Sequence, residues 1–329
     1  MFSLIKKTVL ILFVVSGIDA QASIIDRDDV KAFINSMVVE HGFELDALNA
    51  VFKRIKLSAS IVKAISSPAE ALPWYKYRPI FLKTNRINLG VEFWAKHKID
   101  LAKAEKQYGV PAEIIVAIIG VETRYGKNVG KYKVINSLAT LAFNYPARAG
   151  FFKKELQHYL LLVREQGIDP HAIKGSYAGA MGIPQFISSS YRHYAVDFDN
   201  DGLIDIWKNP ADAIGSVANY FKVHGWKAGR MIAEPAHIKG RMYIQLLSNE
   251  LKPELPVVDL AGFGITAEND LPAGEKVRLL ELENANGSEY WLGFENFYVI
   301  TRYNHSLLYA MAVYQLAMEI RLKYVAEVA

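Results

Sequence analysis

The sequence contains no cysteine. A disulfide framework, a thiol nucleophile and a metal site with thiolate ligands are therefore excluded. A lipoprotein anchored through a modified cysteine is excluded for the same reason. If the chain is exported, we expect it to be soluble in the periplasm or only peripherally attached to a membrane.

The sequence also lacks a strong excess of charge of either sign. Its 38 lysines and arginines nearly balance 34 aspartates and glutamates, which leaves a formal net charge of +4. This charge is too small to indicate a nucleic-acid partner, although it is compatible with an acidic polymer or a membrane surface. With 51% hydrophobic and 22% charged residues, the 329-residue chain can form one large globular domain or a main domain with a smaller one.

The N-terminus carries only a short apolar run. Two lysines precede the run from Val9 to Val15, and the motif Ala20-Gln21-Ala22 follows it. A charged start, a short apolar core and an A-x-A site predict a signal peptide, residues 1–22, cleaved after Ala22. An uncleaved membrane anchor is the alternative, and it would need about 20 apolar residues.

A second apolar stretch, VPAEIIVAIIGVETRYG from Val110 to Gly126, ends on one carboxylate, Glu122. Proline suits a first helical turn and glycine a C-terminal stop, so we expect a buried helix from about Pro111 to Tyr125. Burial and the helix C-terminus both disfavour a charged carboxylate. Glu122 is therefore a candidate general acid that is protonated near neutral pH. The alternative is an ordinary buried glutamate paired with a distant arginine or lysine.

Aromatic residues and prolines cluster in the segment PWYKYRPIF, which contains Trp74, Tyr75 and Tyr77. Aromatic rings beside prolines often pack at the edge of a core, and they also suit stacking on sugar faces. The sequence leaves both interpretations open.

The segment KGSYAGAMGIPQF, Lys174 to Phe186, contains three glycines. Glycines let a ligand or another backbone approach closely. Tight helix packing explains the same pattern equally well.

An acidic segment, DFDNDGLIDIW, runs from Asp197 to Trp207. Its aspartates at the first, third and fifth positions and its glycine at the sixth match the first half of an EF-hand calcium loop. The twelfth position, where a bidentate glutamate is expected, is Lys208, which cannot ligate calcium. Either Asp212 closes the loop or the segment is an acidic turn without metal.

The chain changes character near residue 244. Helical spacing of apolar residues dominates before this point, whereas prolines and glycines separate short apolar runs from Ile244 to Ile300. Asn286-Gly287 between two such runs predicts a hairpin. We therefore expect a mainly α protein, with an α-helical body of residues 23–243 and 301–329 and a small β-rich inserted domain of residues 244–300.

Five stretches match one family: IIGVETRYG, SLATLAFNYPARA, KGSYAGAMGIPQF, DFDNDGLIDIWKNPADAIGSVANYFKVHGW and ITRYNHSLLYAMAVYQLA. From about Trp74 to Leu316, in order and spacing, the chain resembles the membrane-bound lytic transglycosylase B family of murein-degrading enzymes. The resemblance implies a lysozyme-like catalytic core, about residues 101–243, within an α-helical body.

The resemblance also implies an activity. Such enzymes cleave the β-1,4 bond between N-acetylmuramic acid and N-acetylglucosamine without adding water, and they leave a 1,6-anhydromuramic end. The expected partner is the glycan strand of peptidoglycan, with cell-wall synthesis or division complexes as further candidates. We expect a monomer that needs no cofactor for catalysis and binds at most a structural Ca²⁺.

Individual site residues carry over from the same resemblance. Glu122 falls on the family's single catalytic glutamate. The substrate contacts map onto Ser176, Gln185, Tyr220, Tyr303 and Asn304, and by a looser match onto Tyr77 and Tyr309. Asn304 is also a candidate cap for the helix that follows it. The cation loop maps onto Asp197, Asp199, Asp201, the carbonyl of Leu203, and Asp212.

Two other functions remain open at this point. A hydrolytic muramidase would use the same groove with a second acid across from Glu122. A murein-binding or scaffolding protein without catalytic activity belongs to a different class, and the retention of Glu122 and of the glycine-rich segment argues against it.

Overall fold

The computed structural model describes residues 23–66 and 72–328, and the predicted signal peptide lies outside this part of the chain. The chain divides into two compact units, one ending at Ile55 and the other beginning at Lys56. The first contains α1 (Asp28–His41) and α2 (Leu45–Lys53), and Gly42 ends α1 in the left-handed conformation. The sequence analysis placed residues 23–243 in one body, because helical periodicity continues across this division.

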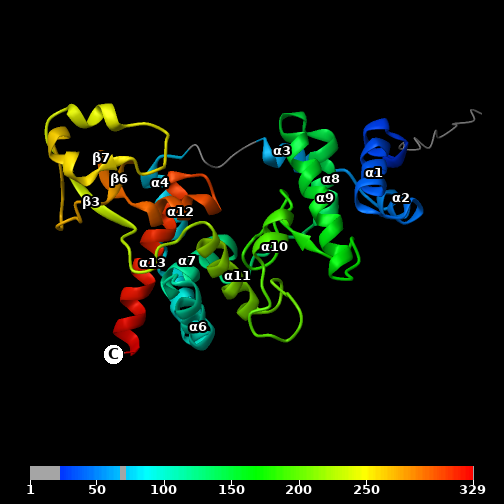
Figure 1. The fold of residues 1–329 in the computed structure, drawn as a ribbon, viewed down its shortest axis with the longest axis horizontal. Coiled ribbons are helices and arrows are strands. Elements are labelled where there is room, and N and C mark those ends of the chain that lie inside the picture. Colours follow the sequence, from blue (N-terminus) through cyan, green and yellow to red (C-terminus); the bar gives the residue numbers. More distant parts are fainter. Residues whose placement is uncertain (1–22, 67–71, 329) are drawn as a thin grey trace, which may run out of the picture. The chain divides into compact units, whose positions relative to one another are not determined.

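The second unit holds every strand and the remaining helices of the described residues (Figure 1). Its helices are α3 (Ala59–Ile65), α4 (Trp74–Phe81), α5 (Thr84–Lys96), α6 (Lys98–Tyr108), α7 (Ala112–Thr123), α8 (Val134–Asn144), α9 (Ala149–Glu165), α10 (Ser188–Tyr194), α11 (Pro210–Val223), α12 (Glu295–Tyr303) and α13 (Leu307–Val328). Its strands are β1 (Tyr132–Lys133), β2 (Lys174–Gly175), β3 (Ala233–Ile238), β4 (Leu255–Pro256), β5 (Ile265–Ala267), β6 (Lys276–Asn284) and β7 (Gly287–Gly293).

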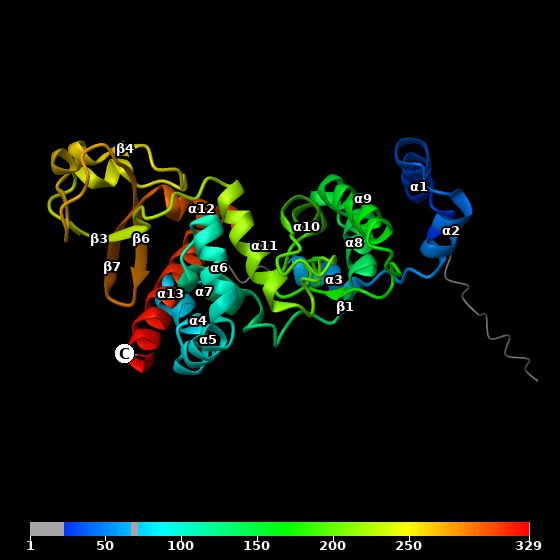
Figure 2. The ribbon, with the colours of Figure 1, turned by 60° about the horizontal axis from the view of Figure 1, so that its bottom comes forward.

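Helix α7 forms the centre of this unit. Every residue from Ala112 to Gly120 is buried, because α5, α6, α11 and α13 surround the helix (Figure 2). A helix that is apolar on all sides is stable only in such a position. At its N-terminus, the Glu105 carboxylate accepts a hydrogen bond from the Ala112 N–H at 3.3 Å and satisfies one free donor.

The end of α7 differs from the prediction. The helix stops at Thr123, two residues before the expected Tyr125, and Gly126 is not its cap. Arg124 and Tyr125 both adopt the left-handed conformation, with φ of 51° and 61°. The Arg124 N–H bonds to the Gly120 carbonyl and the Tyr125 N–H to the Ile119 carbonyl. Non-glycine residues rarely adopt this conformation, at about 1–2 kcal/mol each, so tertiary packing must hold this turn.

The β-rich region is a five-stranded antiparallel sheet in the order β4-β6-β7-β3-β5. Strands β6 and β7 form the predicted hairpin, in which Leu282 pairs with Glu289 and Asn284 with Gly287. One face of the sheet covers a small apolar core that comprises Ala236, Leu260, Ile265, Val277, Leu279, Leu292 and Phe294.

The predicted limits of this region, residues 244–300, were wrong at both ends. The sheet begins earlier, with β3, whose sequence AEPAHI contains a proline and lacks the alternation of a typical strand. It ends earlier too, because residues 295–300 belong to α12. The run ENFYVIT is rich in aromatic and β-branched residues, and such a short run does not distinguish a buried helix from a strand.

No helix within residues 23–66 and 72–328 is both long enough and apolar enough to cross a bilayer.

Candidate active site

Glu122 is the second-last residue of α7, where the buried helix meets solvent. Its side chain is partly accessible, yet the protein packed around the carboxyl group raises the pKa of Glu122 to about 7. The largest cause is loss of hydration on burial, which disfavours the charged form. Glu122 can therefore both donate and accept a proton near neutral pH.

The hydroxyl of Tyr309 on α13 donates a hydrogen bond of 2.6 Å to Oε1 of Glu122. This bond favours the carboxylate and lowers the pKa of Glu122, against the larger effect of burial. The pKa of Tyr309 is raised well above its usual range, first by burial and then by the neighbouring Glu122. Tyr309 thus remains a neutral donor and orients one oxygen of the acid.

The strained turn after Glu122 is held by packing between α5 and α7. The Tyr125 ring lies against Gly90 and Gly120, where an added Cβ would come within 2.6 Å of the Tyr125 hydroxyl. That hydroxyl donates to the Arg86 carbonyl at 2.9 Å, and the Arg86 guanidinium donates to the Gly120 carbonyl at 3.0 Å. These contacts fix the C-terminal end of α7 and the direction in which Glu122 leaves it.

Thr123, the next residue, joins this helix end to the glycine-rich segment. Its buried hydroxyl donates to the Ile183 carbonyl at 2.9 Å and accepts from the Gly126 N–H at 3.0 Å. Gln185 follows within the same segment in the left-handed conformation, with φ of 53°. Its amide nitrogen donates to the carbonyls of Val129 and Gly182, at 3.2 and 2.9 Å.

Ser176 is used within its own loop. Its hydroxyl oxygen accepts hydrogen bonds from the N–H groups of Ala178 and Ala180, at 3.2 and 3.0 Å. The loop is tight, since a Cβ on Gly175 would lie 2.2 Å from the Ala180 carbonyl oxygen and one on Gly182 would lie 2.6 Å from the Ile206 carbonyl oxygen. These glycines therefore permit a close approach of two backbones, which was one of the interpretations of the sequence.

Tyr220 and Tyr303 form an aromatic wall with Phe186. The ring centroids of the two tyrosines are 4.8 Å apart. The Phe186 centroid lies 5.8 Å from that of Tyr220 and 6.0 Å from that of Tyr303. The Tyr303 hydroxyl donates to the Pro184 carbonyl at 2.6 Å, and the Tyr220 hydroxyl to the Arg302 carbonyl at 2.5 Å. Both hydroxyls thus fix the wall in place, and the Tyr220 ring is itself buried and stacked on His224 with centroids 4.0 Å apart.

Asn304 follows Tyr303 and lies in extended backbone between α12 and α13. The expectation that it caps the next helix was wrong. That role belongs to Ser306, whose hydroxyl oxygen accepts from the Tyr309 N–H at 3.3 Å. Tyr77 on α4 is buried, and its hydroxyl contributes to the raised pKa of Tyr309, the residue that bonds to Glu122.

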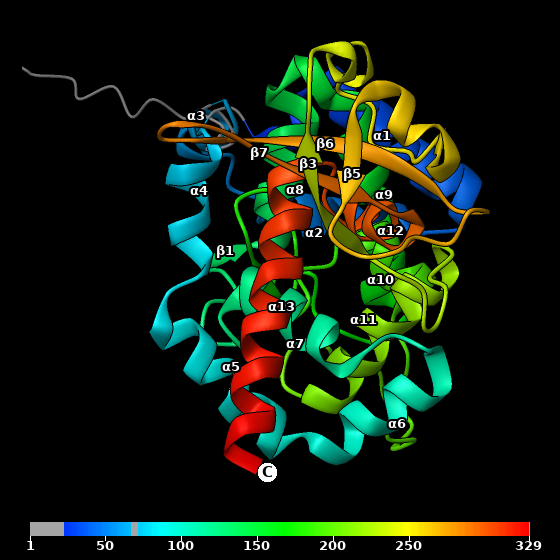
Figure 3. The same cartoon turned by 90° about the vertical axis from the view of Figure 1, so that its left-hand side faces the viewer.

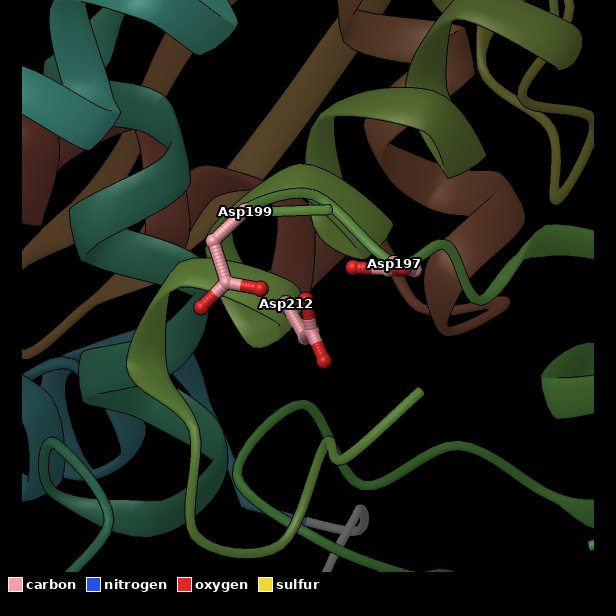
Figure 4. Close-up of side chains that lie close together, drawn as sticks. All are labelled: Asp197, Asp199 and Asp212. Carbon is pink, nitrogen blue, oxygen red and sulfur yellow. The ribbon is translucent and has the colours of Figure 1, made fainter. Parts of the chain in front are cut away.

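The acidic loop brings three carboxylates together. One oxygen each from Asp197, Asp199 and Asp212 lie within 4.8 Å of one another (Figure 4). Asp212 is fully buried, and burial followed by the nearby aspartates raises its pKa. Asp201 instead accepts a hydrogen bond from the N–H of Leu203 at 2.8 Å. An oxygen-only cluster of this kind is suited to a hard cation such as Ca²⁺.

The family designated Transglycosylase SLT domain matches residues 26–318 of this chain. The chain belongs to this transglycosylase family. The Escherichia coli strain K12 protein named membrane-bound lytic murein transglycosylase B is 43% identical over 307 residues, which cover 90% of this chain and 84% of that protein.

Solved structures of lytic transglycosylases agree with this assignment. Catenated SltB1 from Pseudomonas aeruginosa matches with a TM-score of 0.87 and 50% identity, over 91% of this chain and 98% of that one. Escherichia coli Slt35 in complex with calcium matches with a TM-score of 0.85 and 43% identity, over 91% and 95% of the two chains. The predicted family, the mainly α fold with a lysozyme-like core and the class of enzyme are thereby confirmed.

Several residues that shape this transglycosylase site escaped the sequence analysis. Thr123, Tyr125 and Arg86 fix the end of α7, yet none belongs to a pattern that indicates such a role. The glycine at position 120 is a hint, because it is a glycine inside the predicted helix and so signals close packing.

Proposed function

We propose that this chain is a lytic transglycosylase that cleaves the β-1,4 bond between N-acetylmuramic acid and N-acetylglucosamine in peptidoglycan without adding water. Membership of the family supports the reaction class. One observation supports the assignment of the mechanism to Glu122. Among the described residues, burial and the hydrogen bond from Tyr309 set the pKa of Glu122, and no second carboxylate contributes to it.

A lone acid argues against ordinary hydrolysis. Glycosidases that use water need two carboxyl groups, about 5–9.5 Å apart across the bond. The groups that face Glu122 here are tyrosines, Tyr309 and Tyr303, whose pKa values are both raised well above the usual range, so neither replaces a second carboxylate. This arrangement supports a reaction in which the substrate supplies its own nucleophile.

The reaction then proceeds in two proton transfers through one residue. Protonated Glu122 gives its proton to the glycosidic oxygen as the bond from C1 to that oxygen breaks. The Glu122 carboxylate next takes the proton of the C6 hydroxyl while O6 bonds to C1 and closes the 1,6-anhydro ring. Glu122 ends as it began, no water is consumed and no cofactor is required. A pKa of about 7 suits a group that must act in both directions.

The remaining predicted contacts divide into two kinds. Ser176, Gln185 and Asn304 present polar groups along the glycan, with Asn304 on the segment that follows the aromatic wall. Tyr303 would line the groove beside the sugars, with the buried rings of Tyr220 and Tyr77 as the wall behind it. Tyr309 orients Glu122 and lies within reach of the same substrate.

We also propose that the acidic loop binds a structural Ca²⁺. Asp197, Asp199 and Asp212 would supply three oxygens, and Asp201 and the Leu203 carbonyl complete the set that the resemblance implies. Support comes from the mutual approach of the three carboxylates and from the calcium complex of Slt35. The loop is distinct from Glu122, so its role is to stabilise the fold.

Export to the periplasm is a further part of the proposal. It rests on the signal peptide predicted for residues 1–22 and on the name of the Escherichia coli relative as a murein enzyme. Sequencing the N-terminus of protein recovered from a periplasmic fraction tests it, with Ser23 as the expected first residue.

Mass spectrometry of digestion products tests the central proposal. Wild-type protein and murein should yield anhydro-ended muropeptides, one water lighter than the corresponding reducing ends. Glu122→Gln should abolish release. Glu113→Gln is the matched control, because Glu113 is a buried acid on the same helix that is paired with Arg321 at 3.1 Å; it should retain activity.

The same experiment separates the alternatives. Reducing ends as the sole product would replace this proposal by a hydrolytic muramidase. Binding to murein sacculi without any release of fragments would point to the scaffolding function instead.

A further inference from the structure

Glu289 on β7 collects three hydrogen bonds from two different parts of the fold. Its Oε1 accepts from the indole N–H of Trp74 at 3.0 Å and from that of Trp291 at 3.3 Å. Its Oε2 accepts from the side-chain amide of Asn284 at 3.0 Å. Trp291 and Asn284 belong to the β6–β7 hairpin, whereas Trp74 belongs to α4.

Trp74 is the first residue of α4 and is almost completely buried, with 1% of its surface exposed. Its bond to Glu289 ties the start of α4 to the β6–β7 hairpin, which extends over this end of the helix (Figure 3). Near its other end, α4 is tied to α13, where Arg78 donates to Gln315 at 2.8 Å. The helix thus spans from the sheet to the helix that carries Tyr309.

Tyr77 lies between these two attachments. Its ring stacks near Trp74, with centroids 6.4 Å apart and planes at 28°. It is buried, α4 packs on α13, and the Tyr77 hydroxyl adds to the raised pKa of Tyr309, which bonds to Glu122. Any shift of Trp74 therefore moves Tyr77 relative to the acid.

We propose that Glu289 is a positioning residue for this reaction: through Trp74 it sets the position of α4 and so of Tyr77 near Tyr309, the hydrogen-bond partner of Glu122. The inference rests on the proposed function, because it assigns Tyr77 a part in substrate binding. It also gives the small sheet a role in the activity, although none of its strands carries a residue of the proposed site.

The three donors to Glu289 allow a matched comparison. Trp74→Phe and Trp291→Phe each remove one indole N–H from the same carboxylate oxygen, but only the first loosens α4. Asn284→Ala removes the third donor within the hairpin. Glu289→Leu removes all three bonds at once, whereas Glu289→Gln keeps an oxygen that can accept from both indoles.

We expect Trp74→Phe and Glu289→Leu to lower kcat/KM on a soluble murein oligomer by about tenfold to a hundredfold, the range expected when a remote change misplaces a substrate contact. Glu289→Gln should retain most of the activity. Trp291→Phe and Asn284→Ala should leave kcat/KM unchanged. The pH profile should not move in any of them, because burial and Tyr309, and not Tyr77, set the pKa of Glu122.

A double-mutant cycle with Tyr77→Ala separates positioning from a general loss of stability. If Glu289 acts through Tyr77, Glu289→Leu should lower kcat/KM little further once Tyr77 is absent. Additive losses would overturn the inference, as would equal effects of Trp74→Phe and Trp291→Phe. If Glu289→Leu does not fold, Trp74→Phe in the same cycle carries the test. Failure of the proposed function looks different, since wild type would then release no anhydro ends.

Discussion

Tyr309 and Glu122, 187 residues apart in the chain, meet through a hydrogen bond of 2.6 Å between the phenol and one carboxylate oxygen. Two opposing influences act on the acid at this point. Burial raises the pKa of Glu122, and the bond from Tyr309 lowers it, with a result of about 7. The proposed reaction requires one group to donate a proton and then to accept one, and a pKa near 7 suits both steps.

The activity should therefore depend on pH in a defined direction. Free enzyme must carry protonated Glu122 to begin, so kcat/KM should fall as pH rises above about 7. Tyr309→Phe removes a bond that favours the carboxylate. The pKa of Glu122 should then rise, and the alkaline limb should move to higher pH while the maximal rate falls. A profile of kcat/KM against pH for both proteins measures this, and an unmoved limb in Tyr309→Phe would contradict it.

Stability should report the same titration. The pKa of Glu122 is about 7 when folded and near 4.5 in a solvated chain, so the folded state holds the proton more tightly. The tighter proton binding adds to the free energy of unfolding; this stabilisation is fully present below about pH 4.5 and is lost as the pH rises to about 7. Relative to Glu122→Gln, which does not ionise, the wild type should lose free energy of unfolding across that window and then level off. Urea titrations at several pH values give the difference, and a constant gap would exclude the raised pKa.

Thr123 should matter to activity beyond its effect on stability. Thr123→Val keeps the shape of the side chain but leaves the Ile183 carbonyl and the Gly126 N–H without their partner. We expect a loss of about 1–3 kcal/mol in the free energy of unfolding, together with a fall in kcat as the glycine-rich segment shifts away from Glu122.

The control for this change is Thr140→Val on α8. Thr140 is also buried, and its hydroxyl donates to Asn136 at 2.6 Å and accepts from the Ser58 N–H at 3.2 Å. The Thr140→Val variant should lose a similar amount of free energy of unfolding as Thr123→Val, with no loss of kcat. Equal kinetic effects of the two substitutions would show that Thr123 does not position the segment.

These contacts show where the sequence is informative. Glu122 stands out because one acid lies near the end of an otherwise apolar stretch, and the acidic segment stands out because its spacing matches the first half of a calcium loop. The order and spacing of the motifs indicated the family, and the resemblance to that family supplied most of the candidate tyrosines. Each of these signals is local, or repeats a pattern along the chain.

The contacts that fix the site join residues far apart in the chain. Thr123 bonds to Ile183, and Trp74 to Glu289, across 60 and 215 positions, and neither pair leaves a periodic pattern. The end of α7 was placed two residues late because Tyr125 adopts a positive φ only through its packing against other helices. Strand β3 was missed because its partners β5 and β7, and not its own residues, make it a strand.

The glycine at position 120 should be irreplaceable for a packing reason. In Gly120→Ala the new methyl would lie 2.6 Å from the Tyr125 hydroxyl and 2.7 Å from the ring. Overpacking of this kind costs about 1–3 kcal/mol, which exceeds the gain in helix propensity. It should also shift the strained turn after Glu122 and lower kcat.

Gly150→Ala is the matched control for the Gly120 substitution. Gly150 lies in α9 with nothing within 4 Å of an added Cβ and with an ordinary φ. Here the gain in propensity is unopposed, and the substitution should stabilise by about 0.4–1 kcal/mol. Thermal melts and activity assays of both variants measure these changes in stability and in kcat. A stabilising Gly120→Ala would mean that Tyr125 does not occupy the position described.

Calcium should stabilise the protein without taking part in the chemistry. Without a cation, burial and the adjacent aspartates raise the pKa of Asp212, so the folded protein should lose stability as pH rises through that raised value. A bound Ca²⁺ removes this repulsion, and the melting temperature should rise with calcium concentration as binding to the native state requires. The increase should be larger at pH 7 than at pH 5.

Asp199→Asn is the sharpest variant for this test, because Asp199 is exposed and the new amide oxygen can still accept the hydrogen bond that Asn209 donates to Asp199 at 2.9 Å. The change also removes one of the charges that raise the pKa of Asp212. It should remove most of the calcium-dependent rise in melting temperature. Asp270→Asn, at an exposed position of the sheet region, is the control and should respond to calcium like the wild type. If chelator leaves the wild-type melting temperature unchanged and added calcium does not raise it, the loop is an acidic turn, and the hydrogen bonds that Asp212 accepts from Phe198 and Asp205, both at 2.7 Å, are what hold it together.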